Sequence, residues 1–336
     1  MPDADLLIVG AGIAGASAAW YASRAGLRTL IIDAGAHRAS DVPTALINPV
    51  RGLAGRVPKH APAGARHTFD LISRLQAHGH AIPHGRGVWR PVPDASVQAA
   101  WSAQFPPDLM HRWHPGAPPF LNLRGHWHAT LECPESGWVD GPALVRALLA
   151  DSGAERITAT VTALDIPGHG VTLDKGDQLA ARELLWCAGA WGAHTMGFEA
   201  VYRPGSVIAT KSRSSEHAIA HGLYAAPHGP TSVLGPTHEP ATNIWPDATT
   251  PPAALPTLIE RARGIFEQPI EIATIWRGVR LGRVTTPPGL KALGPYGARG
   301  FLMAPMEAAD FIEHGGKRCA DALGRHASPD VPPARD

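Results

Sequence analysis

A glycine loop between a short apolar run and a helix-like segment constrains the fold of this chain more than any other feature. Residues 5–20 read DLLIVGAGIAGASAAW. The run Leu6–Val9 predicts a buried parallel strand that ends at a glycine. Gly10 permits a tight turn, Gly12 lets the backbone approach a pyrophosphate, and Gly15 lets the next helix pack against the strand. The sequence therefore predicts the first strand and helix of a dinucleotide-binding domain.

The segment after this helix supplies the acidic residue that such a domain uses. We expect the helix to run to about Ala25 and to stop at Gly26, and RTLIID (Arg28–Asp33) predicts the second strand. Asp33 is placed at the tip of that strand, where a carboxylate accepts both ribose hydroxyls of an adenosine and disfavours a 2′-phosphate. Strand, glycines, helix, strand and acid in this order are much more specific than a lone glycine motif. They leave both NAD and FAD open.

Composition limits the classes of protein that the chain can belong to. Its 336 residues exceed one compact core, so we expect two domains. A formal net charge of +1 argues against a nucleic-acid binder that works by bulk electrostatics. Cys133, Cys187 and Cys319 are too scattered for a disulfide framework or a zinc site. The 18 histidines contain no H-E-x-x-H pattern, so we predict no metal site.

The first predicted strand begins almost at the N-terminus, without a basic or apolar leader in front of it. We therefore expect no secretory signal. No apolar run approaches the roughly 18 residues of a membrane span. The chain is expected to be cytoplasmic, without a membrane partner.

A second glycine-rich loop lies at the other end of the chain, in GPYGARGFLMAPMEAADFIEHG (Gly294–Gly315). The apolar spacing of Met306–Ile312 predicts a helix, and Pro305 suits the first helical turn. A nicotinamide enzyme has no evident need for a second helix N-terminus. A flavin enzyme does, because N1 and O2 of the reduced isoalloxazine carry negative charge that a helix N-terminus stabilises. The pair of loops favours FAD.

With these two loops in place, the chain resembles the FAD-dependent amino-acid and amine oxidoreductases of the D-amino-acid oxidase superfamily, which includes glycine oxidase and sarcosine oxidase. GARGFLMAP is similar to a segment of the flavin domain of the bifunctional enzyme that makes 5-methylaminomethyl-2-thiouridine in tRNA. Four further segments match family motifs: ESGWVDGPALVRALL (Glu135–Leu149), LLWCAGAWG (Leu184–Gly192), SVLGPTHEP (Ser232–Pro240) and WRGVR (Trp276–Arg280). The resemblance spans the whole chain.

The resemblance implies an α/β fold (α+β overall), with a Rossmann-like FAD-binding domain of the glutathione-reductase type and a discontinuous antiparallel-sheet substrate domain. The FAD-binding domain is expected to comprise residues 1–75, 138–198 and 276–336, and the substrate domain residues 76–137 and 199–275. Residues 325–336 are expected to form a flexible tail.

The resemblance also implies which residues hold a non-covalent FAD. Ser40 is expected near the pyrophosphate, residues 44–46 near the flavin ring, and Val161 over the adenine. The full predicted set is Gly10, Ala11, Gly12, Ile13, Ala14, Gly15, Asp33, Ala34, Ser40, Thr44, Ala45, Leu46, Val161, Cys187, Ala188, Gly189, Trp191, Gly297, Arg299, Gly300, Phe301 and Leu302. The family more often has Glu in place of Asp33. The turn NPVRG (residues 48–52) has no assigned task.

In this family the enzyme takes a hydride equivalent from a carbon next to nitrogen, and the imine product hydrolyses in water. The flavin carries the electronics, so we expect no acid–base triad. Arg280 matches the arginine that binds the substrate carboxylate in glycine-oxidase-like proteins, and a guanidinium grips a carboxylate through two parallel hydrogen bonds. The alternative role for Arg280 is a structural ion pair with a neighbouring acidic residue. Arg299 is expected to position its loop or to contact the flavin or substrate edge.

Two departures keep other functions open. The loop after Arg280 is shorter than in the family and lacks its usual aspartate. The resemblance implies FAD-dependent oxidation of the C–N bond of an amino acid or N-substituted glycine. It does not assign the electron acceptor, and oxygen is one candidate. The alternatives are oxidation of the carboxymethylaminomethyl group of a tRNA wobble uridine by a free-standing domain, a non-catalytic FAD protein, and an NAD enzyme. Five lysines argue against tRNA as a partner, and 25 arginines leave it open.

Overall fold

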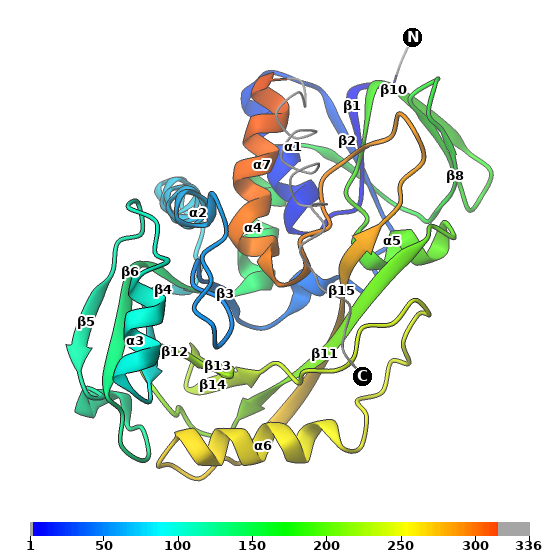
Figure 1. Cartoon of the computed structure of the whole chain (residues 1–336). Helices are drawn as coiled ribbons and strands as arrows, with labels where there is room; N and C mark the ends of the chain where they lie inside the picture. The colour runs from blue at the N-terminus through cyan, green and yellow to red at the C-terminus, as the bar shows by residue number, and fades with distance from the viewer. Residues whose placement is uncertain (1–2, 315–336) are drawn as a thin grey trace.

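Two β-sheets and the helices packed on them make up the protein, as the computed structural model shows for residues 3–314 (Figure 1). The first sheet has the order β7 (Glu155–Thr158), β2 (Thr29–Asp33), β1 (Ala4–Val9), β10 (Gln178–Trp186), β9 (Gly170–Leu173), β8 (Val161–Asp165), with β16 (Lys291–Ala292) beside β10. The second sheet has the order β15 (Ile272–Val284), β11 (Ala200–Thr210), β14 (Thr231–Gly235), β13 (Leu223–His228), β12 (Ala218–His221), β4 (His84–Val92), β6 (Ala129–Val139), β3 (Ala45–Ile47), with β5 (Arg112–Pro115) beside β6. The α-helices are α1 (Ile13–Arg24), α2 (Ala61–Ala77), α3 (Ala95–Ser102), α4 (Gly141–Ser152), α5 (Gly189–Thr195), α6 (Ala254–Ile265) and α7 (Gly300–His314), and the 3₁₀ helices are η1 (Ala39–Asp41), η2 (Pro119–Leu121) and η3 (Gly297–Arg299).

The first sheet places the glycine loop at the carboxyl ends of its parallel strands. β1 lies between β2 and β10, and its last residue, Val9, pairs with Ile32 and Trp186. Side chains of β1 are buried on both faces, as its continuous apolar run predicts. Because the chain leaves β1 at Gly10, the loop lies at the edge where parallel sheets usually bind ligands.

Helices α1, α4 and α7 form one packed layer, although α7 comes from the far end of the chain (Figure 1). The small residues Ala16, Ala18 and Ala19 of α1 have no exposed surface, which lets the neighbouring helices approach closely. Trp20 of the same helix donates its indole N–H to Asp151 of α4 at 2.8 Å. The layer brings the glycine loop and the C-terminal helix together.

The C-terminal helix corrects one detail of the sequence prediction. We expected Pro305 in the first helical turn, whereas α7 begins at Gly300 and Pro305 lies inside the helix. Proline has no N–H, so the carbonyl of Phe301, four residues earlier, loses its helical donor. The hydroxyl of Thr68 in α2 donates to this buried carbonyl at 3.0 Å. A side chain from another helix therefore replaces the missing bond and anchors α2 to α7.

The second sheet is held by its two longest neighbouring strands and by one helix. β11 and β15 pair from Ala200 opposite Val284 to Thr210 opposite Ile272. Apolar side chains of α6 pack on this sheet, with Leu258 almost fully buried. Figure 1 shows α6 along the lower edge of the view, beneath β11 and β15. The sheet is thereby covered on one side, and strands β12, β13 and β15 contribute to a cavity toward α7.

The mixed architecture confirms the predicted α/β fold class, a Rossmann-like unit combined with a largely antiparallel sheet. The division into FAD-binding and substrate domains stays a prediction. Strand β3 and the second half of β15 belong to the second sheet, although both lie in ranges that we assigned to the FAD-binding domain. The expected tail, residues 325–336, lies outside the described residues. Among residues 3–314, no helix is long and apolar enough to cross a membrane.

Candidate cofactor and substrate site

The loop after β1 fits tightly between α1 and the end of β10. Gly10 has a φ of +99°, and a Cβ at this position would lie 2.6 Å from the Cα of Ala188. A Cβ on Gly15 would lie 1.9 Å from the carbonyl oxygen of Gly10. Both positions therefore require glycine. The close approach leaves the N-terminus of α1 facing the edge of the sheet, where the positive end of the helix dipole favours an anion.

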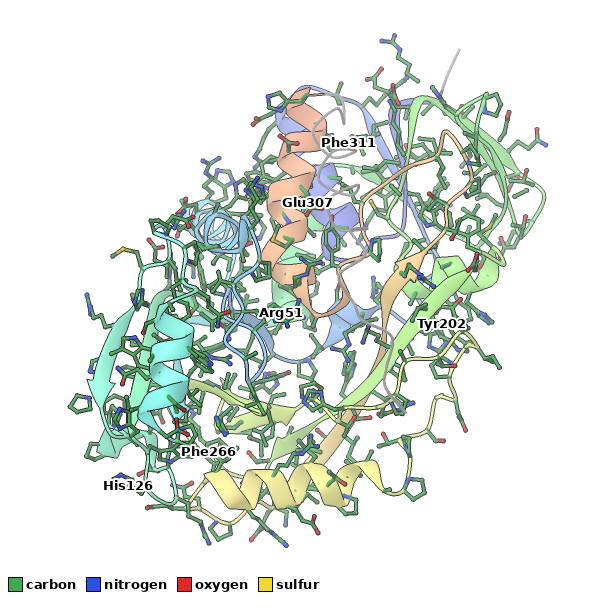
Figure 2. All side chains as sticks on the ribbon, viewed as in Figure 1. Arg51, His126, Tyr202, Phe266, Glu307 and Phe311 are labelled. Atoms are coloured by element: carbon green, nitrogen blue, oxygen red, sulfur yellow. The ribbon has the colours of Figure 1, made fainter. Side chains whose placement is uncertain are left out.

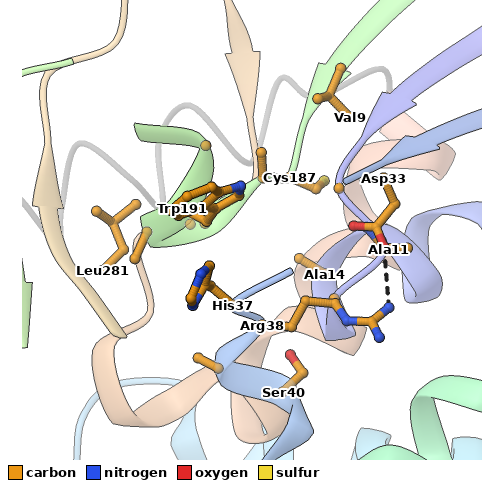
Figure 3. Close-up of a pocket in the computed structure, with 18 of the residues that line it drawn as sticks. Val9, Ala11, Ala14, Asp33, His37, Arg38, Ser40, Cys187, Trp191 and Leu281 are labelled. Carbon is orange, nitrogen blue, oxygen red and sulfur yellow. Dashed lines mark hydrogen bonds and ion pairs between the residues drawn. The ribbon is translucent and has the colours of Figure 1, made fainter. Parts of the chain in front are cut away.

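Two side chains from the segment after β2 bind the backbone of this loop. Asp33 Oδ1 accepts a hydrogen bond from the N–H of Ala11 at 3.1 Å, and its Oδ2 forms an ion pair with Arg38 at 3.2 Å (Figure 3). Ser40 Oγ accepts a hydrogen bond from the N–H of Ile13 at 2.9 Å, in the first turn of α1. Asp33 is thus held at the strand tip. Its contact with a ribose stays a prediction.

A cavity of about 150 Å³ opens in front of the loop (Figure 3). It is lined by fifteen of the residues predicted to bind FAD: Gly10, Ala11, Gly12, Ile13, Ala14, Asp33, Ala34, Ser40, Val161, Cys187, Ala188, Gly189, Trp191, Gly297 and Gly300. His37 and Arg38 also line it, and neither belongs to the predicted set. The His37 ring lies 4.4 Å from the Trp191 ring. Their place directly after the second strand is the only signal that could have indicated them.

A larger cavity, of about 670 Å³, lies between the start of α7 and the second sheet. Of the residues predicted near the flavin ring, Ala45, Leu46 and Phe301 line it. Five predicted residues line both cavities: Ile13, Ser40, Arg280, Gly297 and Gly300. The two cavities therefore meet at the starts of α1 and α7, the two helix N-termini that the sequence predicts to share one cofactor.

Four residues predicted at the site line neither cavity: Gly15, Thr44, Arg299 and Leu302. Gly15 does not face a cavity; it lets α1 pack closely against Gly10, which does. Thr44 donates its hydroxyl to the carbonyl of Pro227 at 3.3 Å, which ties β3 to β13. Leu302, in the first turn of α7, is buried in the core that this helix forms with α1 and α2. For Arg299 a role in positioning its loop stays the prediction.

Arg280 lines both cavities and has no carboxylate partner among residues 3–314. It lies in β15, and its guanidinium contacts only the carbonyls of Arg203 and Pro204, at 3.4 and 3.5 Å, among residues 3–314. Arg277, three residues earlier, forms a buried ion pair with Glu239 at 2.7 Å. Burial lowers the pKa of Arg280, as expected for a cation taken out of water. The local alternative, pairing with a neighbouring acid, applies to Arg277.

Tyr224 of β13 lines the same cavity and is held by a hydrogen bond to the residue just before β3. Its hydroxyl donates to the carbonyl of Thr44 at 2.9 Å. Burial raises the pKa of Tyr224, and the positive charge of Arg280 opposes this rise, so the two groups are close enough to interact. Tyr224 therefore stays neutral, and it stiffens the wall beside Arg280.

A buried carboxyl group in α7 makes folding stability depend on pH. Burial raises the pKa of Glu307 to about 7 from its ordinary value of 4.5 (Figure 2 labels the residue). The unfolded chain ionises first as pH rises, so stability falls between these values and stays low above pH 7. We expect the stability gain of Glu307→Gln over wild type to be about 2 kcal/mol larger at pH 8.5 than at pH 5.5.

Denaturant unfolding of the two proteins at both pH values measures this gain. Glu313→Gln is the control, because Glu313 is an exposed carboxylate in the same helix. A gain for Glu307→Gln that is equal at both pH values would contradict the raised pKa.

The residues of the two cavities fit FAD. The glycine cradle that any Cβ would fill, the N-terminus of α1 and Asp33 suit the adenosine and pyrophosphate. The N-terminus of α7 at Gly300 reaches the larger cavity, where a reduced flavin ring would gain from its dipole. Bound at these residues, FAD supplies the two-electron acceptor. A dinucleotide loop, a second helix N-terminus and an antiparallel sheet around two cavities that share lining residues define a flavin-dependent oxidoreductase.

Comparison with known proteins agrees with this class. The model of the family described as FAD dependent oxidoreductase (DAO) matches residues 5–311. The chain therefore belongs to the DAO family of FAD-dependent oxidoreductases. This membership decides between NAD and FAD in favour of FAD.

Two curated relatives are tRNA 5-methylaminomethyl-2-thiouridine biosynthesis bifunctional proteins. The one from Maricaulis maris is 28% identical over 342 residues, which covers 97% of this chain and 54% of that protein. The one from Magnetococcus marinus is 29% identical over 277 residues, which covers 73% of this chain and 40% of that protein. The chain thus spans about half the length, or less, of these relatives.

Solved structures share the fold over nearly the whole chain. Glycine oxidase from Bacillus cereus has a TM-score of 0.74 at 20% identity, with 93% of this chain and 96% of that chain covered. Iminodiacetate oxidase from Chelativorans sp. has a TM-score of 0.76 at 22% identity, with 97% of each chain covered. At these identities the likeness establishes the fold.

Proposed function

We propose that this FAD-dependent oxidoreductase oxidises the C–N bond of an amino acid or N-substituted glycine whose carboxylate is bound by Arg280. The observation that carries the proposal is the guanidinium of Arg280. It lines both cavities, and no carboxylate among residues 3–314 pairs with it. A half-buried cation without a carboxylate partner among residues 3–314 gains from an anionic ligand, and Arg280 sits where the predicted cofactor and substrate spaces meet.

In this reaction the carbon next to nitrogen loses a hydride equivalent and the nitrogen loses a proton, which leaves an imine. Water then hydrolyses the imine to a carbonyl compound and an amine. Arg280 orients the substrate through its carboxylate, and Tyr224 keeps the adjacent wall in place. The N-terminus of α7 stabilises negative charge that develops at the cofactor side of the cavity.

Names of the structural neighbours support this reaction class, because glycine oxidase and iminodiacetate oxidase both act on amines that carry carboxylates. The proposal also includes that the predicted residues of the two cavities bind FAD without a covalent link. It further includes a cytoplasmic location. The electron acceptor stays open between oxygen and another carrier.

The test is anaerobic reduction of the purified, FAD-loaded protein, followed by its visible absorption. We expect iminodiacetate, sarcosine, glycine or a D-amino acid to bleach the flavin, whereas a carboxylate without an amine leaves the spectrum oxidised. Chemical reduction by dithionite shows that the flavin can be bleached. If dithionite reduces the flavin and no carboxylated amine does, the proposed function is wrong.

A second candidate substrate is the carboxymethylaminomethyl group of a tRNA uridine, favoured by the two curated relatives. The chemistry would be the same, with the carboxymethyl group at Arg280. Retention of tRNA that weakens steeply with salt, together with bleaching by tRNA that carries this group, would support it. Binding that is absent or indifferent to salt would exclude it.

A further inference from the structure

The larger cavity carries more positive charge than one substrate carboxylate requires. Arginines from four different elements or loops line it: Arg51, Arg90, Arg261 and Arg280. Among residues 3–314, no aspartate or glutamate lines it. Its volume of about 670 Å³ also has to hold the flavin ring, so the charge of the lining, and not the volume, bears on the substrate. The positive charge exceeds what the single carboxylate of glycine would use.

One of these arginines is committed to the protein itself. Arg90 in β4 is only 4% exposed, and it donates to the carbonyls of Val50 at 3.0 Å and Gly52 at 2.5 Å. Trp101 in α3 donates its indole N–H to the carbonyl of Leu53 at 3.1 Å. Together they hold residues 50–53 in place, directly after β3.

The held segment presents Arg51 to the cavity. Figure 2 shows Arg51 beneath the lower end of α7 in that view. Its backbone bridges Arg56, but no hydrogen bond or ion pair with residues 3–314 occupies its guanidinium. The structure thus fixes the backbone on both sides of Arg51 and leaves the charged head for a ligand.

Three other arginines act on the charge of Arg51, and among residues 3–314 no aspartate or glutamate opposes them. Arg51 as a whole is exposed, but neighbouring protein atoms take part of the water from its guanidinium, and this desolvation, followed by the positive charges of Arg299, Arg280 and Arg203, lowers its pKa. Like charges held together in a protein repel one another, and a bound anion relieves this repulsion. Since Arg280 lies in the same cavity, one ligand with two anionic groups can relieve both arginines at once.

We propose that Arg51 binds a second anionic group, so that the substrate is an amine with one carboxylate at Arg280 and a further carboxylate or phosphate at Arg51. This inference deepens the proposed function and takes its reaction class from it. The anion-binding step itself does not depend on oxidation, so the two claims can fail separately.

The test uses ligands in which an ether oxygen replaces the amine, so that no oxidation of a C–N bond occurs. The FAD-loaded protein is titrated by calorimetry with three ligands. Oxydiacetate has a second carboxylate, (phosphonomethoxy)acetate has a phosphonate in its place, and methoxyacetate has one carboxylate alone; the first two are called the dianions. We expect wild type to bind at least one dianion more tightly than methoxyacetate. Arg51→Gln should weaken that dianion by about tenfold to a hundredfold and leave methoxyacetate unchanged.

Arg56→Gln is the matched control, because Arg56 bridges Arg51 across the same turn, is exposed, and lines neither cavity. It should leave all three dissociation constants unchanged, and the FAD content of both variants should equal that of wild type. A stronger effect on the carboxylate arm identifies a dicarboxylate, and a stronger effect on the phosphonate arm identifies a phosphorylated substrate.

Equal affinities of wild type and Arg51→Gln for both dianions would overturn the inference, as would loss of FAD from Arg51→Gln alone. If the dianions bind as expected but no carboxylated amine bleaches the flavin, the anion site stands and the proposed oxidation fails.

Discussion

Arg280→Gln is expected to lower kcat/KM for a carboxylated amine by about two to three orders of magnitude, with the FAD content unchanged. The guanidinium has no carboxylate partner among residues 3–314, so the substrate carboxylate is its expected counter-ion. Removal of one member of a hydrogen-bonded charge pair costs about 2–5 kcal/mol, and the expected loss of rate, about 3–4 kcal/mol, lies within this range. Arg280→Lys keeps the charge but loses the two-pronged geometry, so an intermediate loss is expected.

The kinetics are measured with the amine that bleaches the wild-type flavin most efficiently. Arg283→Gln is the matched control, since Arg283 lies in the same strand but is exposed and lines neither cavity. A simple amine without a carboxylate gives a second control, because its poor kcat/KM should not respond to Arg280→Gln. Full activity of Arg280→Gln toward carboxylated amines would remove the central support for the proposed function.

The sequence alone does not decide which of two neighbouring arginines is left for a substrate. The sequence WRGVR offers two arginines, and a family resemblance singles out the second. The structure adds the reason: Glu239, 38 residues before Arg277, pairs with Arg277 and leaves Arg280 to the cavity. Such a distant ion pair has no signature in the local pattern.

The parts of the fold that could be predicted are those with local causes. The glycine loop, the helix after it and the strand ending at Asp33 follow from neighbouring residues, and the structure has all three. The start of α7 could not be predicted, because a proline six residues into a helix is tolerated only when another group replaces its bond. That group is Thr68, more than 200 residues earlier in the chain.

Arg51 was missed for a related reason. The turn that contains it can be recognised in the sequence, but its task depends on Arg90 and Trp101, which hold the segment, and on the cations that face it. Each of these comes from a different part of the chain. Fold class and cofactor were therefore predictable from motifs, whereas the charge of the substrate cavity required the tertiary structure.

Gly10→Ala is expected to abolish FAD retention and to destabilise the protein by more than about 3 kcal/mol, because two separate costs add at this position. Its φ of +99° is strained for any residue with a Cβ, at roughly 1–2 kcal/mol. The new Cβ would also lie 2.6 Å from the Cα of Ala188 and from the carbonyl oxygen of Cys187. Both atoms belong to the backbone at the end of β10, so neither can move without disturbing the edge of the sheet.

Gly26→Ala separates these two costs. Gly26 has a φ of +74°, and a Cβ there would meet no atom within 4 Å. The variant therefore carries the backbone strain alone, far from either cavity, and should lose about 1–2 kcal/mol while keeping its flavin. The ratio of FAD to protein after desalting, and urea unfolding of both variants, make the comparison. Should Gly10→Ala retain FAD and match Gly26→Ala in stability, the loop after β1 could not be the cradle of the dinucleotide. If Gly10→Ala loses FAD and more stability than Gly26→Ala, the difference comes from the crowded Cβ, and the loop after β1 is then the part of the protein that holds the cofactor.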